Sequence, residues 1–215
     1  MKSEIPRSLI DELTDELEPV RVMSASDGIA MVLMALAISI VAVAAVGGLR
    51  DGLVSSPPPT LFLIANLLYL LLGLAAMTAV INMAGPRVGN RHDAPKWALA
   101  MVAVLPLAAA VSYANPDALF HELSDDRYGW QCAVYGSLAA IFVTAALLLW
   151  LRRGAPVSPE RAGLWSGVAA GALGSAAYGL HCPIDTISHL GFWHVVPIVV
   201  CGALGRVAMP PLLRW

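Results

Sequence analysis

The chain has 215 residues, of which 58% are hydrophobic and only 13% are charged. Soluble globular domains carry about a quarter charged residues, so this composition excludes that class and indicates a membrane protein. The net charge of −2 excludes no partner by itself, because the positions of the charges carry more information than their sum.

The polar segment 1–22 predicts a short amphipathic helix. Leu9, Leu13 and Leu17 recur every four residues beside Ile10, and acids cover the opposite face. Up to residue 27 there are seven acids and three bases. Such a face is repelled by anionic lipid, and a short helix is marginal alone in water. We therefore expect it to dock on a protein, ahead of the alternatives of a solvated leader or a helix lying on lipid.

Six apolar segments follow, each close to the roughly 20 residues that cross a hydrocarbon core. They are 28–49, 60–84, 97–113, 129–151, 162–180 and 190–209. The segment between the third and fourth, 114–128, is predicted to be an acidic and aromatic loop. In the fifth, Gly163, Gly167 and Gly171 predict a face for close helix packing. The expected fold is an all-α polytopic membrane protein, with a cytoplasmic segment 1–22 and a six-helix transmembrane bundle over 23–215.

The basic residues predict which side is cytoplasmic. Eleven of the 13 Lys and Arg fall in the N-terminal segment, the second and fourth loops and the C-terminal tail. Only Arg50 and Arg127 fall in the first, third and fifth loops. By the positive-inside rule, both termini are cytoplasmic and the odd loops face the outside.

Thiols and imidazoles from three segments converge on this predicted outer side. They are Cys132, Cys182, His121, His181, His189 and His194. Thiolate with imidazole suits copper(I), zinc or cadmium, and two thiols in an oxidising compartment can instead form a disulfide. A purely structural role for the cysteines is an equal alternative, since free Cys is often buried and inert. Cys201 is predicted near mid-membrane as a small buried residue.

The sequence favours a non-enzymatic protein. It contains no C-x-x-C pair, phosphate-binding glycine loop or H-E-x-x-H signature. The alternative that stays open is a membrane metal-handling protein or a thiol-disulfide oxidoreductase.

The residues resemble the NrsF-type anti-sigma factors over essentially the whole chain. The resemblance rests on the stretch from Leu9 to Arg21, Cys132, Cys182-Pro183, Trp193 and the Arg214-Trp215 ending. It implies a bacterial inner-membrane protein that holds an extracytoplasmic-function sigma factor through its N-terminal segment, with no direct contact to nucleic acid. The implied partner-binding residues are Leu9, Ile10, Leu13, Leu17, Pro19, Val20 and Arg21. It further implies that Cys132 and Cys182 sense heavy metals or oxidants from the periplasm.

Overall fold

The computed structural model describes residues 23–53, 57–85, 94–113 and 115–213, together with Asp11, Thr14 and Asp15. These three residues are helical, but the rest of the predicted N-terminal helix lies outside the described residues. Leu9, Ile10, Leu13, Leu17, Pro19, Val20 and Arg21 all fall in that part, so the amphipathic helix stays a prediction.

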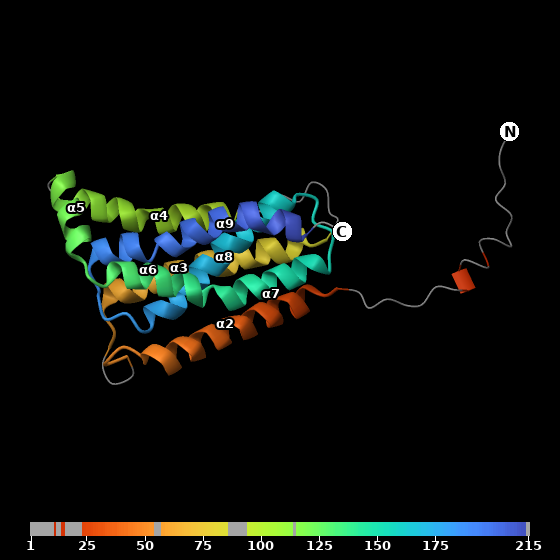
Figure 1. The fold of residues 1–215 in the computed structure, drawn as a ribbon, viewed down its shortest axis with the longest axis horizontal. Coiled ribbons are helices and arrows are strands. Elements are labelled where there is room, and N and C mark those ends of the chain that lie inside the picture. The colour runs from red at the N-terminus through yellow and green to blue at the C-terminus, as the bar shows by residue number, and fades with distance from the viewer. Residues whose placement is uncertain are drawn as a thin grey trace.

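The described chain is all-helical (Figure 1). Its long elements run roughly parallel and antiparallel in one bundle. In chain order, the elements of the described chain are α2 (Ala25–Gly47), α3 (Thr60–Met83), α4 (Ala94–Ser112), α5 (Pro116–Asp125), α6 (Gly129–Ala139), α7 (Ile141–Arg152), α8 (Pro159–Gly179), the π-helical turn η1 (His189–Trp193) and α9 (Val196–Leu212).

Five helical segments are long and apolar enough to cross a membrane. These are α2, α3, α4, the nearly continuous pair α6–α7, and His189–Leu212. The predicted count of six is thus confirmed only for five. The segment expected at 162–180 does form a helix, α8, of 21 residues. Its many Gly, Ala and Ser residues make it less apolar than the other five.

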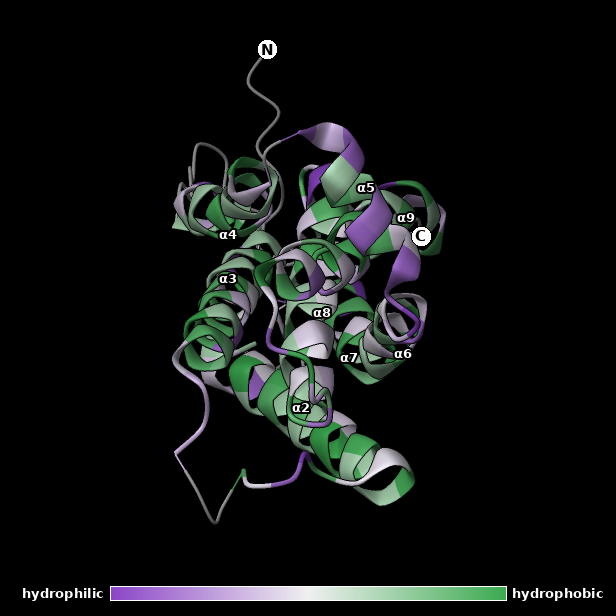
Figure 2. Ribbon diagram, turned by 90° about the vertical axis from the view of Figure 1, so that its left-hand side faces the viewer, coloured by the Kyte–Doolittle hydropathy of each residue, from purple (hydrophilic) through white to green (hydrophobic). Residues whose placement is uncertain are grey.

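The composition of α8 follows from its place at the centre of the bundle, with α2, α3, α6, α7 and α9 around it (Figure 2). Small side chains let the neighbouring backbones come close. A Cβ atom added at Gly167 would lie 1.9 Å from the carbonyl oxygen of Cys201, and one at Gly163 would lie 2.2 Å from that of Gly205. The predicted packing role of these glycines is confirmed.

The segment 114–128 is not the loop that its composition predicts. It contains α5, a short helix of mostly exposed residues that Figure 2 shows as more hydrophilic than the bundle. Asn115 caps it, its side chain accepting from the backbone N–H of Ala118 at 2.7 Å. Pro116 occupies the first helical turn and Asp117 follows. This Asn-Pro-Asp order is a helix start signal, so the loop prediction was wrong.

The two ends of the bundle are chemically different. The beginning of α2 and the C-terminal end of α9 lie at one end (Figure 1). The opposite end carries α5, the connection from α2 to α3, and the turn after α8 that contains Cys182 and Pro183. We call this opposite end the thiol end.

Candidate functional site

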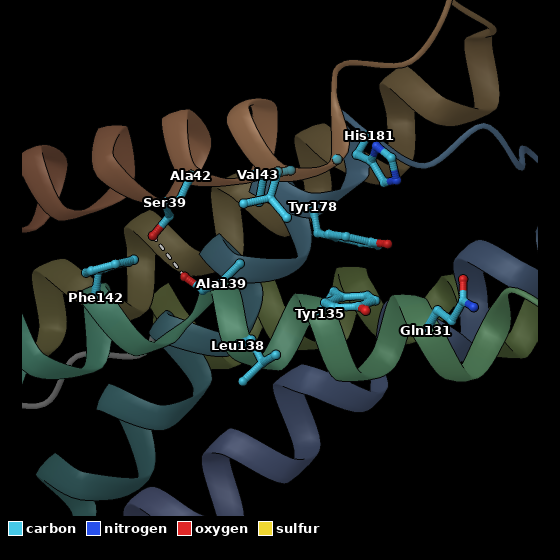
Figure 3. Close-up of a pocket in the computed structure, with 12 residues that line it drawn as sticks. Ser39, Ala42, Val43, Gln131, Tyr135, Leu138, Ala139, Phe142, Tyr178 and His181 are labelled. Carbon is cyan, nitrogen blue, oxygen red and sulfur yellow. Dashed lines mark hydrogen bonds between the residues drawn. The ribbon is translucent and has the colours of Figure 1, made fainter.

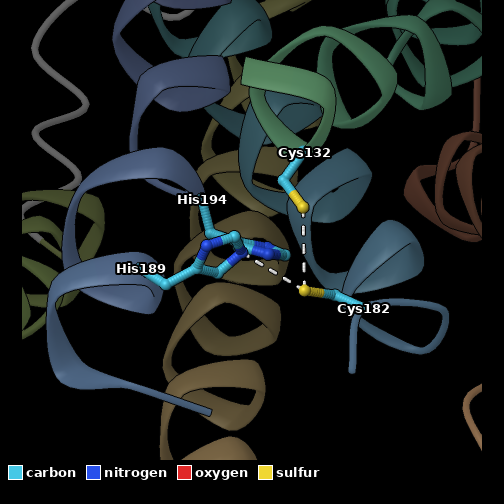
Figure 4. Close-up of side chains that lie close together, drawn as sticks. All are labelled: Cys132, Cys182, His189 and His194. Carbon is cyan, nitrogen blue, oxygen red and sulfur yellow. Dashed lines mark hydrogen bonds between the residues drawn. The ribbon is translucent and has the colours of Figure 1, made fainter. Parts of the chain in front are cut away.

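Two cysteines and two histidines meet at the thiol end (Figure 4). Cys132 comes from the first turn of α6, Cys182 from the turn after α8, and His189 and His194 from η1 and the residue after it. The Sγ atoms of Cys132 and Cys182 are 3.6 Å apart. One ligand atom from each of the four residues lies within 4.8 Å of every other. We call these four residues the thiol–imidazole cluster.

The π-helical turn is what places both histidines in the cluster. His189 and His194 are five residues apart, which in an α-helix would separate their side chains by about 140° around the axis. A π turn repeats at five residues and brings such a pair onto one face. Gly191 inside this turn lies against the backbone of α4, where an added Cβ would meet the carbonyl oxygen of Leu105 at 2.8 Å.

Neighbouring helices satisfy backbone groups around the π turn. The Tyr69 hydroxyl of α3 donates to the carbonyl of Leu190, and the Ser175 hydroxyl of α8 donates to the carbonyl of His194 at 2.7 Å. Irregular backbone in a membrane bundle persists only where the protein supplies such partners. Both hydroxyls therefore fix the geometry of the two imidazoles.

Asp126 orients His189 toward the sulfur atoms. One carboxylate oxygen lies 2.5 Å from Nδ1 of His189, while the other accepts the N–H of Gly129 at 3.0 Å and so caps α6. Because the carboxylate accepts, Nδ1 carries a proton and Nε2 faces Cys182 Sγ at 3.2 Å. A carboxylate behind a histidine in this way is the usual outer partner of a metal-ligating imidazole.

The cluster favours the thiolate of Cys182. Hydrogen bonds from the Cys132 thiol, and then from His189, lower the pKa of Cys182, although burial acts in the opposite direction. The thiolate is the form that binds metal and attacks electrophiles. Of the two cysteines, Cys182 is therefore the one on which the thiolate is favoured.

The donor set fits a soft metal ion. Two sulfur and two imidazole donors form the set that tetrahedral zinc sites use, and sulfur ligands also select copper(I). Nε2 of His194 is buried and has no hydrogen-bond partner among the described residues. A buried ring nitrogen without a partner is unfavourable, and a metal bound by the other three residues would satisfy it. Bound there, such an ion would draw Cys132, Cys182, His189 and His194 together.

Two of the predicted metal candidates lie outside this cluster. His121 is exposed on α5, where Nδ1 pairs with Asp125 at 3.0 Å. Nδ1 of His181 bonds the carbonyl of Gly48 at 2.9 Å, which ties the end of α8 to the end of α2. The structure thus brings together four of the six predicted residues.

A cavity of about 380 Å³ at the thiol end is lined in part by the two cysteines. It is lined by residues that include Arg50, Tyr128, Cys132, Tyr178, His181 and Cys182. Arg50 is held at its edge by Asp185 through two hydrogen bonds of 2.8 and 2.7 Å. The two buried cysteines therefore lie beside a cavity at the thiol end.

Asp126, Tyr69 and Ser175 were missed by sequence reasoning. Of these three residues, only Asp126 could have been found from the sequence. An acid three residues before the glycine that begins α6 is a candidate for a helix cap. The positions of Tyr69 and Ser175 inside apolar spans give no pattern that predicts their contacts with the π turn.

Comparisons with known proteins agree on one family. The family model described as "Negative regulator of sigma F" (NrsF) matches residues 13–215. The anti-sigma-F factor NrsF of Caulobacter vibrioides is 32% identical over 149 residues, which cover 67% of this chain and 68% of that protein. A probable anti-sigma-F factor NrsF of Azospira oryzae is 32% identical over 84 residues, covering 39% of each chain. No solved structure matches.

Proposed function

Since the chain belongs to the NrsF family of negative regulators of sigma F, we propose that it is a membrane-bound anti-sigma factor of the bacterial inner membrane. It holds an extracytoplasmic-function sigma factor through residues 1–22 and releases it when Cys132 and Cys182 react with a metal ion or an oxidant in the periplasm. The single observation that carries this proposal is the 3.6 Å approach of the two sulfurs at the end of the bundle opposite the start of α2.

The orientation follows from the charges at the two ends. The described bases Arg152 and Arg153 lie at the C-terminal end of α7, which is at the end of the bundle where α2 begins (Figure 1). Arg206 lies in the C-terminal half of α9, 3.8 Å from Glu160 in the first turn of α8. At the thiol end, the described bases are Arg50, which is neutralised by Asp185, and Arg127, which lies between α5 and α6. By the positive-inside rule the beginning of α2 is cytoplasmic and the thiol end periplasmic. Residues 1–22, which lead directly into α2, then lie in the cytoplasm.

This orientation needs α8 to cross the membrane as the sixth span. Its 21 residues are about 30 Å long at 1.5 Å per residue, which matches the hydrocarbon core. Its lower hydropathy is compatible with a crossing because its neighbours, rather than lipid, surround it.

The N-terminal segment 1–22 has properties that complement the basic and apolar surfaces of a sigma factor. An acidic helix with Leu9, Leu13 and Leu17 on one face complements a partner with a basic rim and an apolar groove. Mutation of this stripe is expected to free the sigma factor without a signal.

Three contacts connect the turn that holds Cys182 to the end of α2. Arg50, just after α2, pairs with Asp185 in the turn that holds Cys182, and the backbone N–H of Arg50 donates to Leu180 at 2.9 Å. His181 bonds Gly48. A metal or disulfide that pulls Cys182 toward Cys132 therefore moves the residues that hold the outer end of α2. A switch needs such a two-state element.

The test is a sigma-dependent reporter in cells that carry the full chain. Cys132→Ser and Cys182→Ser should each abolish induction by cadmium, zinc, copper or peroxide, whereas Cys201→Ser should leave it intact. Leu13→Asp should give constitutive expression and loss of sigma-factor co-purification. Normal induction in both outer cysteine variants would refute the sensing role.

The second candidate function is a thiol-disulfide oxidoreductase or metal-handling protein. It is favoured by the order Asp126, His189, Cys182, in which a carboxylate orients an imidazole that can deprotonate a thiol. Catalytic turnover of a dithiol substrate, or metal flux, by the purified chain in vesicles would support it. A single stoichiometric oxidation would support the regulator.

A further inference from the structure

A second cavity opens between α2, α6 and α8 and is lined by side chains from each of them (Figure 3). Its volume is about 450 Å³. Most of its length is apolar, with Ala42 and Val43 on one wall and Leu138 and Phe142 on the other. Ser39, at the inner end, is already satisfied by the carbonyl of Ala139 at 2.8 Å. We call this cavity the lipid-side groove, because the helices that line it are membrane spans.

The outer end of the lipid-side groove is polar. Gln131, Tyr135, Tyr178 and His181 gather there (Figure 3). In the described part of the chain, the side chains of Gln131, Tyr135 and Tyr178 have no hydrogen-bond partner, so an amide and two phenols are available as donors. His181 donates through Nδ1 to Gly48, which leaves its Nε2 as an acceptor.

The groove continues into the cavity that is lined in part by the two cysteines. Gly47, Gln131, Tyr178 and His181 line both. Tyr178 also packs against Cys132 and Cys182 in one small cluster of buried residues. A molecule seated in the groove with its polar head at Tyr178 would therefore lie beside the dithiol.

The charge and shape of the lipid-side groove indicate what kind of polar head group a bound molecule would have. Among the described residues that line the groove, none is Asp, Glu, Lys or Arg, and Arg50 in the adjoining cavity is already paired with Asp185. An anionic phospholipid head would find no free cation there. The rings of Tyr135 and Tyr178 stack with centroids 5.7 Å apart and present flat aromatic surfaces. The best fit is a flat uncharged ring with carbonyl acceptors and an apolar tail.

We propose that the lipid-side groove binds an isoprenoid quinone, which oxidises Cys132 and Cys182 to a disulfide. This inference rests on the proposed function, since it names the oxidant of the same thiol pair. It couples release of the sigma factor to the oxidation state of the membrane quinone pool.

The reaction balances with these groups alone. The S–H bonds of Cys132 and Cys182 break and one S–S bond forms, which releases two electrons and two protons. The quinone takes up both, and its two carbonyl groups become the hydroxyls of a quinol. Nε2 of His189, 3.2 Å from Cys182 Sγ, is placed to hold the proton that Cys182 gives up as it becomes the thiolate, until the quinone takes it up. Nε2 of His181 can accept a hydrogen bond from the quinol.

The test uses the reduced full chain in lipid nanodiscs under anaerobic conditions, with decylubiquinone as the probe. The Cys132–Cys182 disulfide is read by alkylation and mass spectrometry, and quinol by absorbance. We expect one disulfide per quinol formed. Ala42→Phe, which fills the groove, should slow this reaction at least tenfold, whereas Val41→Phe on the exposed surface of α2 should not.

Diamide, a water-soluble thiol oxidant, serves as the control for competent thiols and should close the disulfide equally in all three proteins. If diamide closes it and decylubiquinone does not, the quinone proposal is overturned, the groove holds lipid only, and the proposed sensing function stands. Equal quinone rates in Ala42→Phe and the wild type would overturn the groove as the site. If neither oxidant closes the disulfide, the oxidant half of the proposed function fails as well.

Discussion

α8 and α2 are both about as long as the membrane is thick, yet they are held in opposite ways. Fifteen of the 21 residues of α8 are buried, compared with four of the 23 residues of α2. α8 is fixed by backbones that approach its glycines. α2 presents Val41 and Val46, 66% and 89% exposed, to the surroundings.

The difference separates a fixed part of the molecule from a displaceable one. α8 delivers Cys182 to a defined position, which a site with 3–4 Å spacings requires. α2 carries the N-terminal segment and is tied to the thiol end by Arg50 and His181. Movement during signalling is therefore expected in α2, and the following changes test this contrast.

The largest loss of stability is expected at the centre of the packing interface between α8 and α9, which we call the seam. Gly167→Ala places a Cβ against the backbone of Cys201 and Gly202, where no side chain can turn away. We expect the free energy of unfolding in detergent to fall by about 3 kcal/mol. Gly202→Ala is the matched control, because its Cβ meets the side chains of Val168 at 3.1 Å and Leu164 at 3.7 Å, and the nearest backbone atom is 3.9 Å away. Equal losses in the two variants would contradict the rigid seam.

The link between α2 and the thiol end should matter for signalling more than for stability. Arg50→Met removes a two-point ion pair whose side chains are 8% and 24% exposed, so we expect a loss of about 1.5 kcal/mol. Metal should still bind while reporter induction is lost. The exchange Arg50→Asp with Asp185→Arg should restore induction in part. Full induction in Arg50→Met would show that the signal does not pass from the thiol end through α2.

The reactivity of Cys182 should depend on its neighbours in the cluster and not on α2. Alkylation follows the thiolate fraction, so the lowered pKa of Cys182 should keep the rate high as the pH falls through neutrality. Cys132→Ala removes the strongest donor and raises that pKa toward its ordinary value. The rate at pH 7 should then drop about tenfold.

The pH profile of the Cys182 adduct, read by mass spectrometry, checks this. Cys201→Ser is the control and should leave the profile in place, because Cys201 lies on α9 outside the thiol–imidazole cluster. A profile in wild type with the midpoint of an ordinary thiol would contradict the thiolate in the cluster.

The smallest loss of stability is expected when the exposed ion pair between α8 and α9 is removed. Arg206 and Glu160 are 3.8 Å apart with both side chains more than half exposed. Glu160→Gln should change the free energy of unfolding by less than about 0.5 kcal/mol. A larger loss would mean that charge, and not close backbone contact, holds the seam.

The sequence predicted what hydrophobic length and small-residue spacing determine. The spans, the packing face of Gly163 and Gly167, and the shared depth of Cys132 and Cys182 all depend on local pattern. The contact between Asp126 and His189 and the π turn could not be predicted, because they depend on residues from distant segments, such as Tyr69 and Ser175. The helix start at Asn115 was readable and was overlooked in favour of the acidic composition.

The central claim is that the sulfurs and the N-terminal segment face opposite sides of the membrane. It is tested most directly with single-cysteine chains in intact spheroplasts and a membrane-impermeant maleimide. A chain that keeps only Cys182 should be labelled in intact cells, and one with Ser3→Cys as its only cysteine should be labelled only after lysis. Labelling of both in intact cells, or of both only after lysis, would contradict the account.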